Sequence, residues 1–115
     1  MITEYVTVTG TGKPAQGAAD ITIVAAQGAG KKLYVLRGIV SVTVVAAVAG
    51  GEVALEDGLN GTRFWEADAD ASGFYSFDFG DEGFPLTANT LLNATVDGSG
   101  GNQASARVTV VCKVV

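Results

Sequence analysis

One long run of β-branched and small apolar residues, Lys31 to Leu55, most constrains how this chain can fold. Read at the two-residue period of a β-strand, the first part of the run has two unlike faces. One face carries no charge and consists of Tyr34, Leu36, Gly38, Val40, Val42, Val44 and Ala46. The other is mixed and consists of Leu33, Val35, Arg37, Ile39, Ser41, Thr43 and Val45. Such a strand indicates a sheet that is packed on one side and also meets something on its outer side.

The rest of the chain repeats this alternation in shorter stretches. They are separated by glycine-rich turns, with Asp57-Gly58 and Asn60-Gly61 as strong turn dipeptides because Asp, Asn and Gly tolerate positive φ. No stretch of about ten residues has apolar residues three and four apart, so no helix is expected. A series of about eight or nine short strands predicts an all-β antiparallel sandwich, or else a small barrel.

The chain is expected to form one domain. Its 115 residues are 48% apolar and 17% charged, which suits a packed core. Residues 18–115 are the predicted sandwich, and residues 1–17 are an N-terminal arm or edge strand with a glycine-rich loop. The first residues lack the basic and apolar pattern of a signal peptide, and the longest apolar run is too short to span a membrane, so a soluble compartment is predicted.

Charge and missing residue types exclude several function classes. The net charge of −5 disfavours binding to nucleic acid or to an acidic membrane surface. The chain has no histidine, so a Ser-His-Asp or Cys-His catalytic arrangement and a histidine-ligated metal are impossible. Cys112 is the only cysteine and is expected to be a buried thiol. We therefore predict neither enzymatic activity nor a cofactor.

One acidic segment has the beginning of a calcium loop. Asp68, Asp70 and Ser72 place oxygen donors at alternate positions before Gly73. Phe79 stands where the loop needs a bidentate acid. The segment is therefore interpreted as a solvated acidic turn, with calcium binding as the alternative, and no metal is predicted.

Three aromatic residues fall on strand faces opposite those assigned to the core: Trp65, Phe74 and Tyr5. Either another part of the chain covers them, or they contact a ligand or partner, since aromatic residues are enriched at interfaces. Both interpretations stay open.

From residue 19 onwards, the order of strands and turns resembles the small jelly-roll virion proteins of tailed bacteriophages. The resemblance is carried by Ile21 to Ala26, Gly30 to Leu36, Val53 to Gly58, Gly83 to Leu86 and Thr90 to Val96. It does not cover residues 1–17. It implies a jelly-roll sandwich without enzymatic activity, commonly trimeric, that sits on the capsid as a decoration (cement) protein or on the tail as a fibre or adhesin module.

Together these points predict a non-enzymatic virion structural protein, made in the host cytoplasm and located on the capsid surface. It would bind the major capsid protein of a phage head, through the arm and the loops at Gly28 to Gly30 and Asp97 to Asn102, and neither nucleic acid nor membrane. In the expected homotrimer, Tyr34, Leu36, Val40, Val42 and Val44 form the core, and Leu33, Val35, Ile39 and Val45 form the subunit interface. The alternative is a tail-fibre or receptor- or carbohydrate-binding module that uses Trp65, Tyr75 and the Asp68/Asp70 turn.

Overall fold

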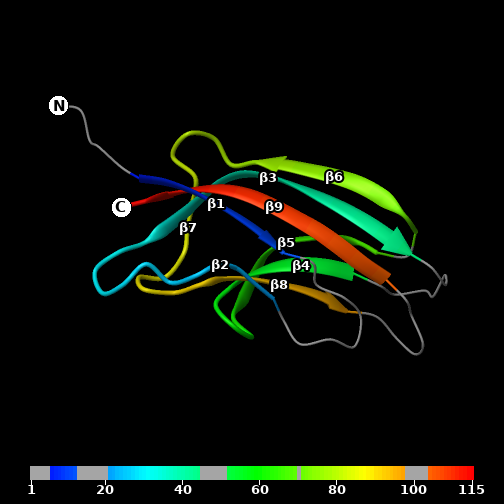
Figure 1. Ribbon diagram of the computed structural model, residues 1–115, viewed down its shortest axis with the longest axis horizontal. Helices are drawn as coiled ribbons and strands as arrows, with labels where there is room; N and C mark the ends of the chain where they lie inside the picture. The colour runs from blue at the N-terminus through cyan, green and yellow to red at the C-terminus, as the bar shows by residue number, and fades with distance from the viewer. Residues whose placement is uncertain (1–5, 13–20, 45–51, 70, 98–103) are drawn as a thin grey trace.

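The computed structural model describes residues 6–12, 21–44, 52–69, 71–97 and 104–115 (Figure 1). These residues form nine β-strands and no helix, so the all-β prediction is confirmed. The strands are β1 (Val6–Gly12), β2 (Ile21–Val24), β3 (Leu33–Val44), β4 (Glu52–Asp57), β5 (Thr62–Asp68), β6 (Gly73–Asp78), β7 (Phe84–Pro85), β8 (Leu92–Asp97) and β9 (Ala104–Val114).

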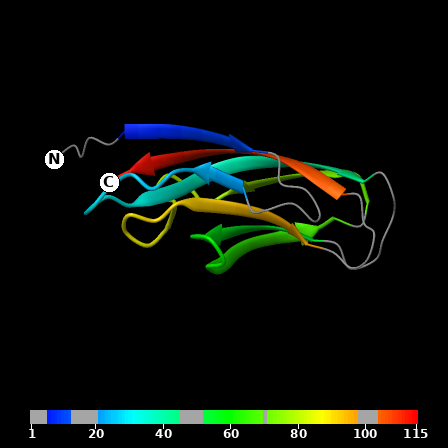
Figure 2. The same ribbon diagram turned by 60° about the horizontal axis from the view of Figure 1, so that its bottom comes forward.

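The strands form two antiparallel sheets that pack together (Figure 2). The five-stranded sheet has the order β1-β9-β3-β6, with the short β7 also paired to β3. The four-stranded sheet has the order β2-β8-β4-β5. The predicted antiparallel β-sandwich is therefore confirmed. The long apolar run that begins at Lys31 supplies β3, which lies near the middle of the five-stranded sheet.

Strand pairing is nested along the chain. β1 pairs with β9, β2 with β8, β3 with β6, and β4 with β5. A long two-stranded ribbon that is folded over on itself has this pairing, because its two arms run side by side over their whole length. β1, the part of the predicted N-terminal arm that the structure describes, is thereby an edge strand of the five-stranded sheet.

The core lies between the two inner faces. Its fully buried side chains include Leu33, Val35, Val40, Val53, Leu55, Leu86, Leu92, Val108, Val110 and Cys112. Cys112 is buried as predicted, and burial raises the pKa of its thiol to about 11, because the thiolate is poorly solvated there. The thiol is therefore protonated and unreactive at neutral pH.

A β-bulge in β3 breaks the strict two-residue alternation that was predicted for this strand. Val35 pairs with Cys112 and Arg37 pairs with Val111, so Leu36 is an extra residue in β3. Because one extra residue exchanges the two faces, odd-numbered residues face the core before the bulge and even-numbered residues face it afterwards.

The bulge corrects the predicted division of β3 into core and interface residues. Leu33 and Val35 are only 1% and 0% exposed, so they belong to the core and cannot meet another subunit. Tyr34 is half-buried and pairs with Lys113, whose Nζ lies 5.3 Å from its ring centroid, so its assignment to the core was wrong. The predictions for Leu36, Val40 and Val42 are confirmed, since all three are buried. The side chains of Val44 and Val45 lie outside the described part of the structure.

A second bulge lies in β5. Leu55 pairs with Trp65 and Glu56 pairs with Arg63, which leaves Phe64 as the extra residue. Phe64 and Trp65 therefore both pack against the core, so the placement of Trp65 on a face away from the core was wrong.

Candidate interaction surfaces

The outer face of the five-stranded sheet carries a patch built from three neighbouring strands, β6, β3 and β9. Their register places nine outward-facing residues in three rows. The rows are Phe74–Ser41–Arg107, Ser76–Ile39–Thr109 and Asp78–Arg37–Val111. We call these nine residues the outer patch.

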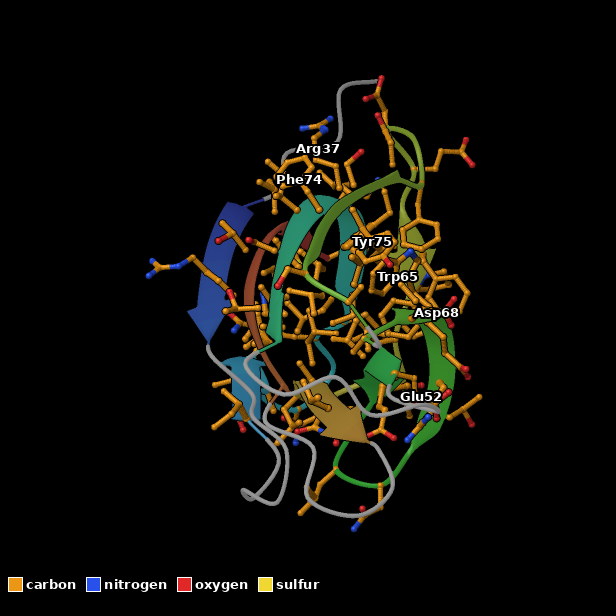
Figure 3. The ribbon with its side chains drawn as sticks, turned by 90° about the vertical axis from the view of Figure 1, so that its right-hand side faces the viewer. Arg37, Glu52, Trp65, Asp68, Phe74 and Tyr75 are labelled. Atoms are coloured by element: carbon orange, nitrogen blue, oxygen red, sulfur yellow. The ribbon has the colours of Figure 1, made fainter. Side chains whose placement is uncertain are left out.

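Two large apolar side chains of the outer patch are exposed to solvent. Phe74 is 67% exposed and Ile39 is 48% exposed. Figure 3 shows Phe74 and Arg37 on the outer side of the sheet, apart from Trp65 and Tyr75. Exposure of Phe74 agrees with the sequence prediction, and Ile39 is the one predicted interface residue that the structure describes as accessible.

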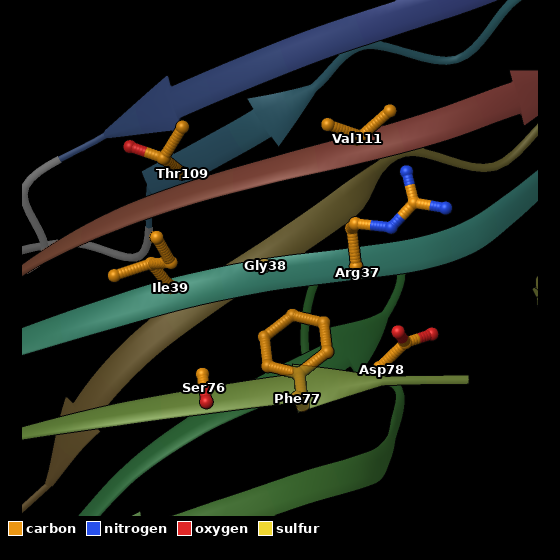
Figure 4. A pocket seen from close by; sticks show the side chains of 8 residues that line it. All are labelled: Arg37, Gly38, Ile39, Ser76, Phe77, Asp78, Thr109 and Val111. Atoms are coloured by element: carbon orange, nitrogen blue, oxygen red, sulfur yellow. The ribbon is translucent and has the colours of Figure 1, made fainter. Parts of the chain in front are cut away.

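A shallow depression lies in the outer patch around Gly38 (Figure 4). Six outer-patch residues line it together with Gly38 and Phe77. Gly38 is required here, because a Cβ at this position would overlap the Phe77 ring and lie 2.8 Å from the carbonyl oxygen of Thr109. The depression is open and belongs to the surface of the sheet.

The charged groups of the outer patch are Arg37, Arg107 and Asp78, which give it one net positive charge in a chain whose net charge is −5. Arg37 lies 3.7 Å from Asp81, and both side chains are largely exposed, so this pair adds little to stability. Arg107 makes no ion pair with any residue in the described part of the chain.

The outer face of the four-stranded sheet is built differently. Arg63 lies between two carboxylates and contacts both Glu52 and Glu56, with 3.3 Å between its Nε and Glu56 Oε2. Asn93 donates from Nδ2 to the other oxygen of Glu56, at 2.7 Å. Glu56 and Asn93 are only 6% and 1% exposed. Each buried polar group thus has a partner within the chain.

Between β5 and β6, aromatic side chains fill one side of the sandwich. Phe64, Trp65, Tyr75, Phe77, Phe79 and Phe84 form what we call the aromatic seam. Neighbouring rings contact along its length, with centroid distances from 4.7 Å for Phe64–Phe84 to 6.2 Å for Trp65–Tyr75. All six are half-buried and pack against the core, so the seam is largely a structural element.

Three residues of the predicted carbohydrate site, Trp65, Tyr75 and Asp68, lie at one end of this seam. The Tyr75 hydroxyl donates to the backbone carbonyl of Asp68 at 2.9 Å, and Trp65 contacts the Tyr75 ring edge-on. Asp68 and Ser72 are exposed, while Asp70 lies outside the described residues. Within the described ranges, no group of three or more His, Cys, Asp or Glu gathers as a metal site. Figure 3 shows Asp68 close to Trp65 and Tyr75.

The β2–β3 turn forms the third accessible surface. Lys31 N donates to Gly28 O, and Asn89 holds the turn from outside, accepting from Gly28 N at 3.0 Å and donating to Lys31 O at 2.7 Å. Asn89 has a φ of 53°, which asparagine adopts more readily than most residues. The turn therefore presents Lys31 and Lys32 to solvent from a fixed backbone.

Sequence reasoning found some of these residues and missed others. Phe74, Ile39 and the β2–β3 turn were singled out, while Tyr5 and the loop 98–102 lie outside the described residues. Asp78, Arg107 and Val111 were missed, because only the pairing of three distant strands brings them to one face.

No protein-family model matches this chain, and a search of curated proteins finds no match. Among the described residues, no helix has the length and apolar character needed to cross a membrane.

Proposed function

We propose that this protein is a non-enzymatic jelly-roll virion protein of a tailed bacteriophage that binds the assembled head as a decoration (cement) protein. The observation that supports it best is the nested pairing of the strands. The two sheet orders, β1-β9-β3-β6 and β2-β8-β4-β5, suit a jelly roll, in which two Greek keys share one sandwich. The strands that carry the sequence resemblance thus occur in a compatible order.

Such a protein acts by mass action. A ligand that binds only the assembled shell stabilises it by about 2.7 kcal/mol when its free concentration is about a hundred times Kd. In this proposal the partner is the major capsid protein, the location is the capsid surface, and the resemblance implies a trimer. The stabilisation comes from buried surface alone.

The β2–β3 turn is the described loop that best suits contact with the shell. Lys31 and Lys32 are exposed, and the backbone that carries them is held by Asn89. A loop that is ordered before binding loses little conformational entropy when it binds. Its two positive charges would suit an acidic area of the shell.

The test is to mix the protein with bare heads from several tailed phages, and to measure co-sedimentation and the melting temperature of the heads. We expect the protein to sediment with one type of head and to raise its melting temperature. The double variant Lys31→Ala/Lys32→Ala should bind more weakly, and Lys113→Ala is the matched control on the outer face. Failure of the wild-type protein to bind any head would contradict the proposal.

A second candidate is a carbohydrate-binding module of a tail fibre. It is favoured by the meeting of Trp65, Tyr75 and Asp68, since aromatic faces beside a few fixed polar groups are typical of small-molecule sites. A glycan array separates the two candidates. Binding to a glycan that Trp65→Phe weakens and Phe84→Leu leaves intact, without affinity for heads, would support this second function.

A further inference from the structure

The outer patch has the composition of a protein–protein interface. It contains an aromatic residue, two aliphatic residues and two arginines, and it has neither Lys nor Glu. Aromatic residues and Arg are enriched at interfaces, whereas Lys, Glu, Asp and Ser are depleted. Asp78, Ser41 and Ser76 depart from this pattern, and the two arginines with the exposed Phe74 follow it. Exposure of Phe74 and Ile39 at diagonal positions in such a patch indicates a surface that becomes covered.

The apolar residues of the outer patch lie along one diagonal. Phe74 is at one corner, Ile39 is in the centre and Val111 is at the opposite corner. The two remaining corners carry opposite charges, Asp78 and Arg107. Strand spacing and rise put these two residues about 17 Å apart within one chain. They cannot form an ion pair there, and salt at physiological ionic strength screens most of their interaction.

This arrangement is complementary to itself. A two-fold axis laid along the diagonal places Phe74, Ile39 and Val111 against the same residues of a second copy. The same operation brings each Arg107 to within about 6 Å, in the plane of the sheet, of the Asp78 of the second copy, on both sides of the apolar diagonal. The long Arg side chain can span this offset. We propose that the chain forms a two-fold dimer through the outer patch, with stacked apolar diagonals and two reciprocal Arg107–Asp78 ion pairs.

The size of the sheet suits such a contact. The strands β1, β9, β3 and β6 have 7, 11, 12 and 6 residues, so at the usual strand spacing and rise they cover about 590 Å². This is at the lower end of the range for specific interfaces, which bury from about 600 Å² per partner. The outer face of the four-stranded sheet is a poorer candidate, because the charges of Arg63 and Glu56 are already matched within the chain.

The proposed dimer does not depend on the proposed function, because a head-binding protein and a glycan-binding protein are equally compatible with it. It does bear on stoichiometry. A contact between identical patches is two-fold by necessity. The trimer implied by the sequence resemblance would therefore need a different surface.

The experiment is sedimentation equilibrium of the full chain and its variants, from low to high micromolar concentration. We expect the wild-type protein to associate to a dimer. Asp78→Arg and Arg107→Asp should each weaken the dimer about tenfold or more, because each places like charges opposite one another. The double variant Asp78→Arg/Arg107→Asp should restore dimerisation, because the exchanged charges meet again across the axis. Since the two residues are too far apart to interact within one chain, this rescue can arise only between copies.

Two further variants keep the test decisive if a charge reversal disturbs the fold. Asp78 accepts a hydrogen bond from Gly80 N at 2.7 Å, so Asp78→Asn removes the charge while retaining that acceptor. Phe74→Ser removes the largest exposed apolar group, and Thr62→Ser on the other sheet is its control. We expect weaker dimers for Asp78→Asn and Phe74→Ser, and no change for Thr62→Ser.

Three outcomes would overturn the proposal: a wild-type monomer at high micromolar concentration, a trimer, or a double charge variant that associates no better than the single variants. Binding to phage heads can be measured on the same preparations. A monomer that still binds heads would overturn the dimer and leave the proposed function intact. A dimer that binds no head would support the dimer and contradict the proposed function.

Discussion

The two outer faces of the sandwich differ in how far their charged groups are paired within the chain. On the four-stranded sheet, Arg63 contacts the carboxylates of Glu52 and Glu56. Asn93 donates a hydrogen bond to the other oxygen of Glu56. On the five-stranded sheet, Arg37 has one loose partner, while Phe74 is left in water. The difference teaches that the number of charges on a face says little about its role. What matters is whether those charges have partners within the chain.

The largest expected effect tests which residues of β3 belong to the outer face at all. Leu33→Ala should lower the free energy of unfolding by about 4 kcal/mol, because it removes fully buried methyl groups and leaves a cavity. Ile39→Ala should lower it by less than about 0.5 kcal/mol, because Ile39 is half-exposed. Urea denaturation measures both. Equal effects would mean that β3 has no bulge and would abolish the distinction between its two faces.

The next effect is a difference in stability between variants of Arg63 and of Arg37. Arg63→Ala should lower the free energy of unfolding by about 3 kcal/mol, because it leaves the buried carboxylate of Glu56 without its positive partner. Arg37→Ala should change it by no more than about 0.5 kcal/mol, since its ion pair is exposed. Chemical denaturation of the two variants under the same conditions gives the comparison. A small effect at Arg63 would show that the two faces are energetically alike.

The free energy of unfolding should depend on pH through Cys112, which lies on the inner face of β9. Burial raises the pKa of the Cys112 thiol from 9.0 to about 11, so the folded state holds this proton more tightly than the unfolded state does. This contribution to stability is fully present below pH 9 and is lost as the pH rises towards 11. The loss should be about 2 kcal/mol. Denaturation at several pH values should show it in the wild-type protein, and Cys112→Ala should lack it.

The smallest effect concerns Phe74, the large apolar residue that is most exposed in the outer patch. Phe74→Ser should leave the free energy of unfolding within about 0.5 kcal/mol of the wild-type value, when both are measured on dilute monomer. Phe74 thus contributes to association and hardly to folding. A large loss of stability in the monomer would instead mean that Phe74 packs against the chain's own residues.

The fold was predictable because its signals are local. Turn dipeptides such as Asp57-Gly58 and strict alternation in β6 need only a few neighbouring residues, and both were interpreted correctly. Phe74 was placed outside for the same reason. Wherever a strand continues without a bulge, the period of two is enough to separate the faces.

The errors all come from single extra residues. Leu33, Tyr34, Val35 and Leu36 are all bulky and apolar enough to suit either face, so a bulge among them leaves no trace in the pattern. Phe64 and Trp65 are equally ambiguous. The presence of Asp78 and Arg107 on one face could not be predicted, for a different reason. Asp78 and Arg107 belong to strands that both flank β3, and only the register of those pairings relates them.

Nested pairing has a consequence for how the chain is made on the ribosome. β4 and β5 are neighbours in sequence and can pair as soon as both have emerged, whereas β1 must wait for β9. β9 also lies between β1 and β3, so a strand that is synthesised after all the others of its sheet fills the middle of that sheet. A nascent chain that stops short of β9 therefore lacks the centre of the five-stranded sheet, and its other strands keep exposed edges until β9 has emerged.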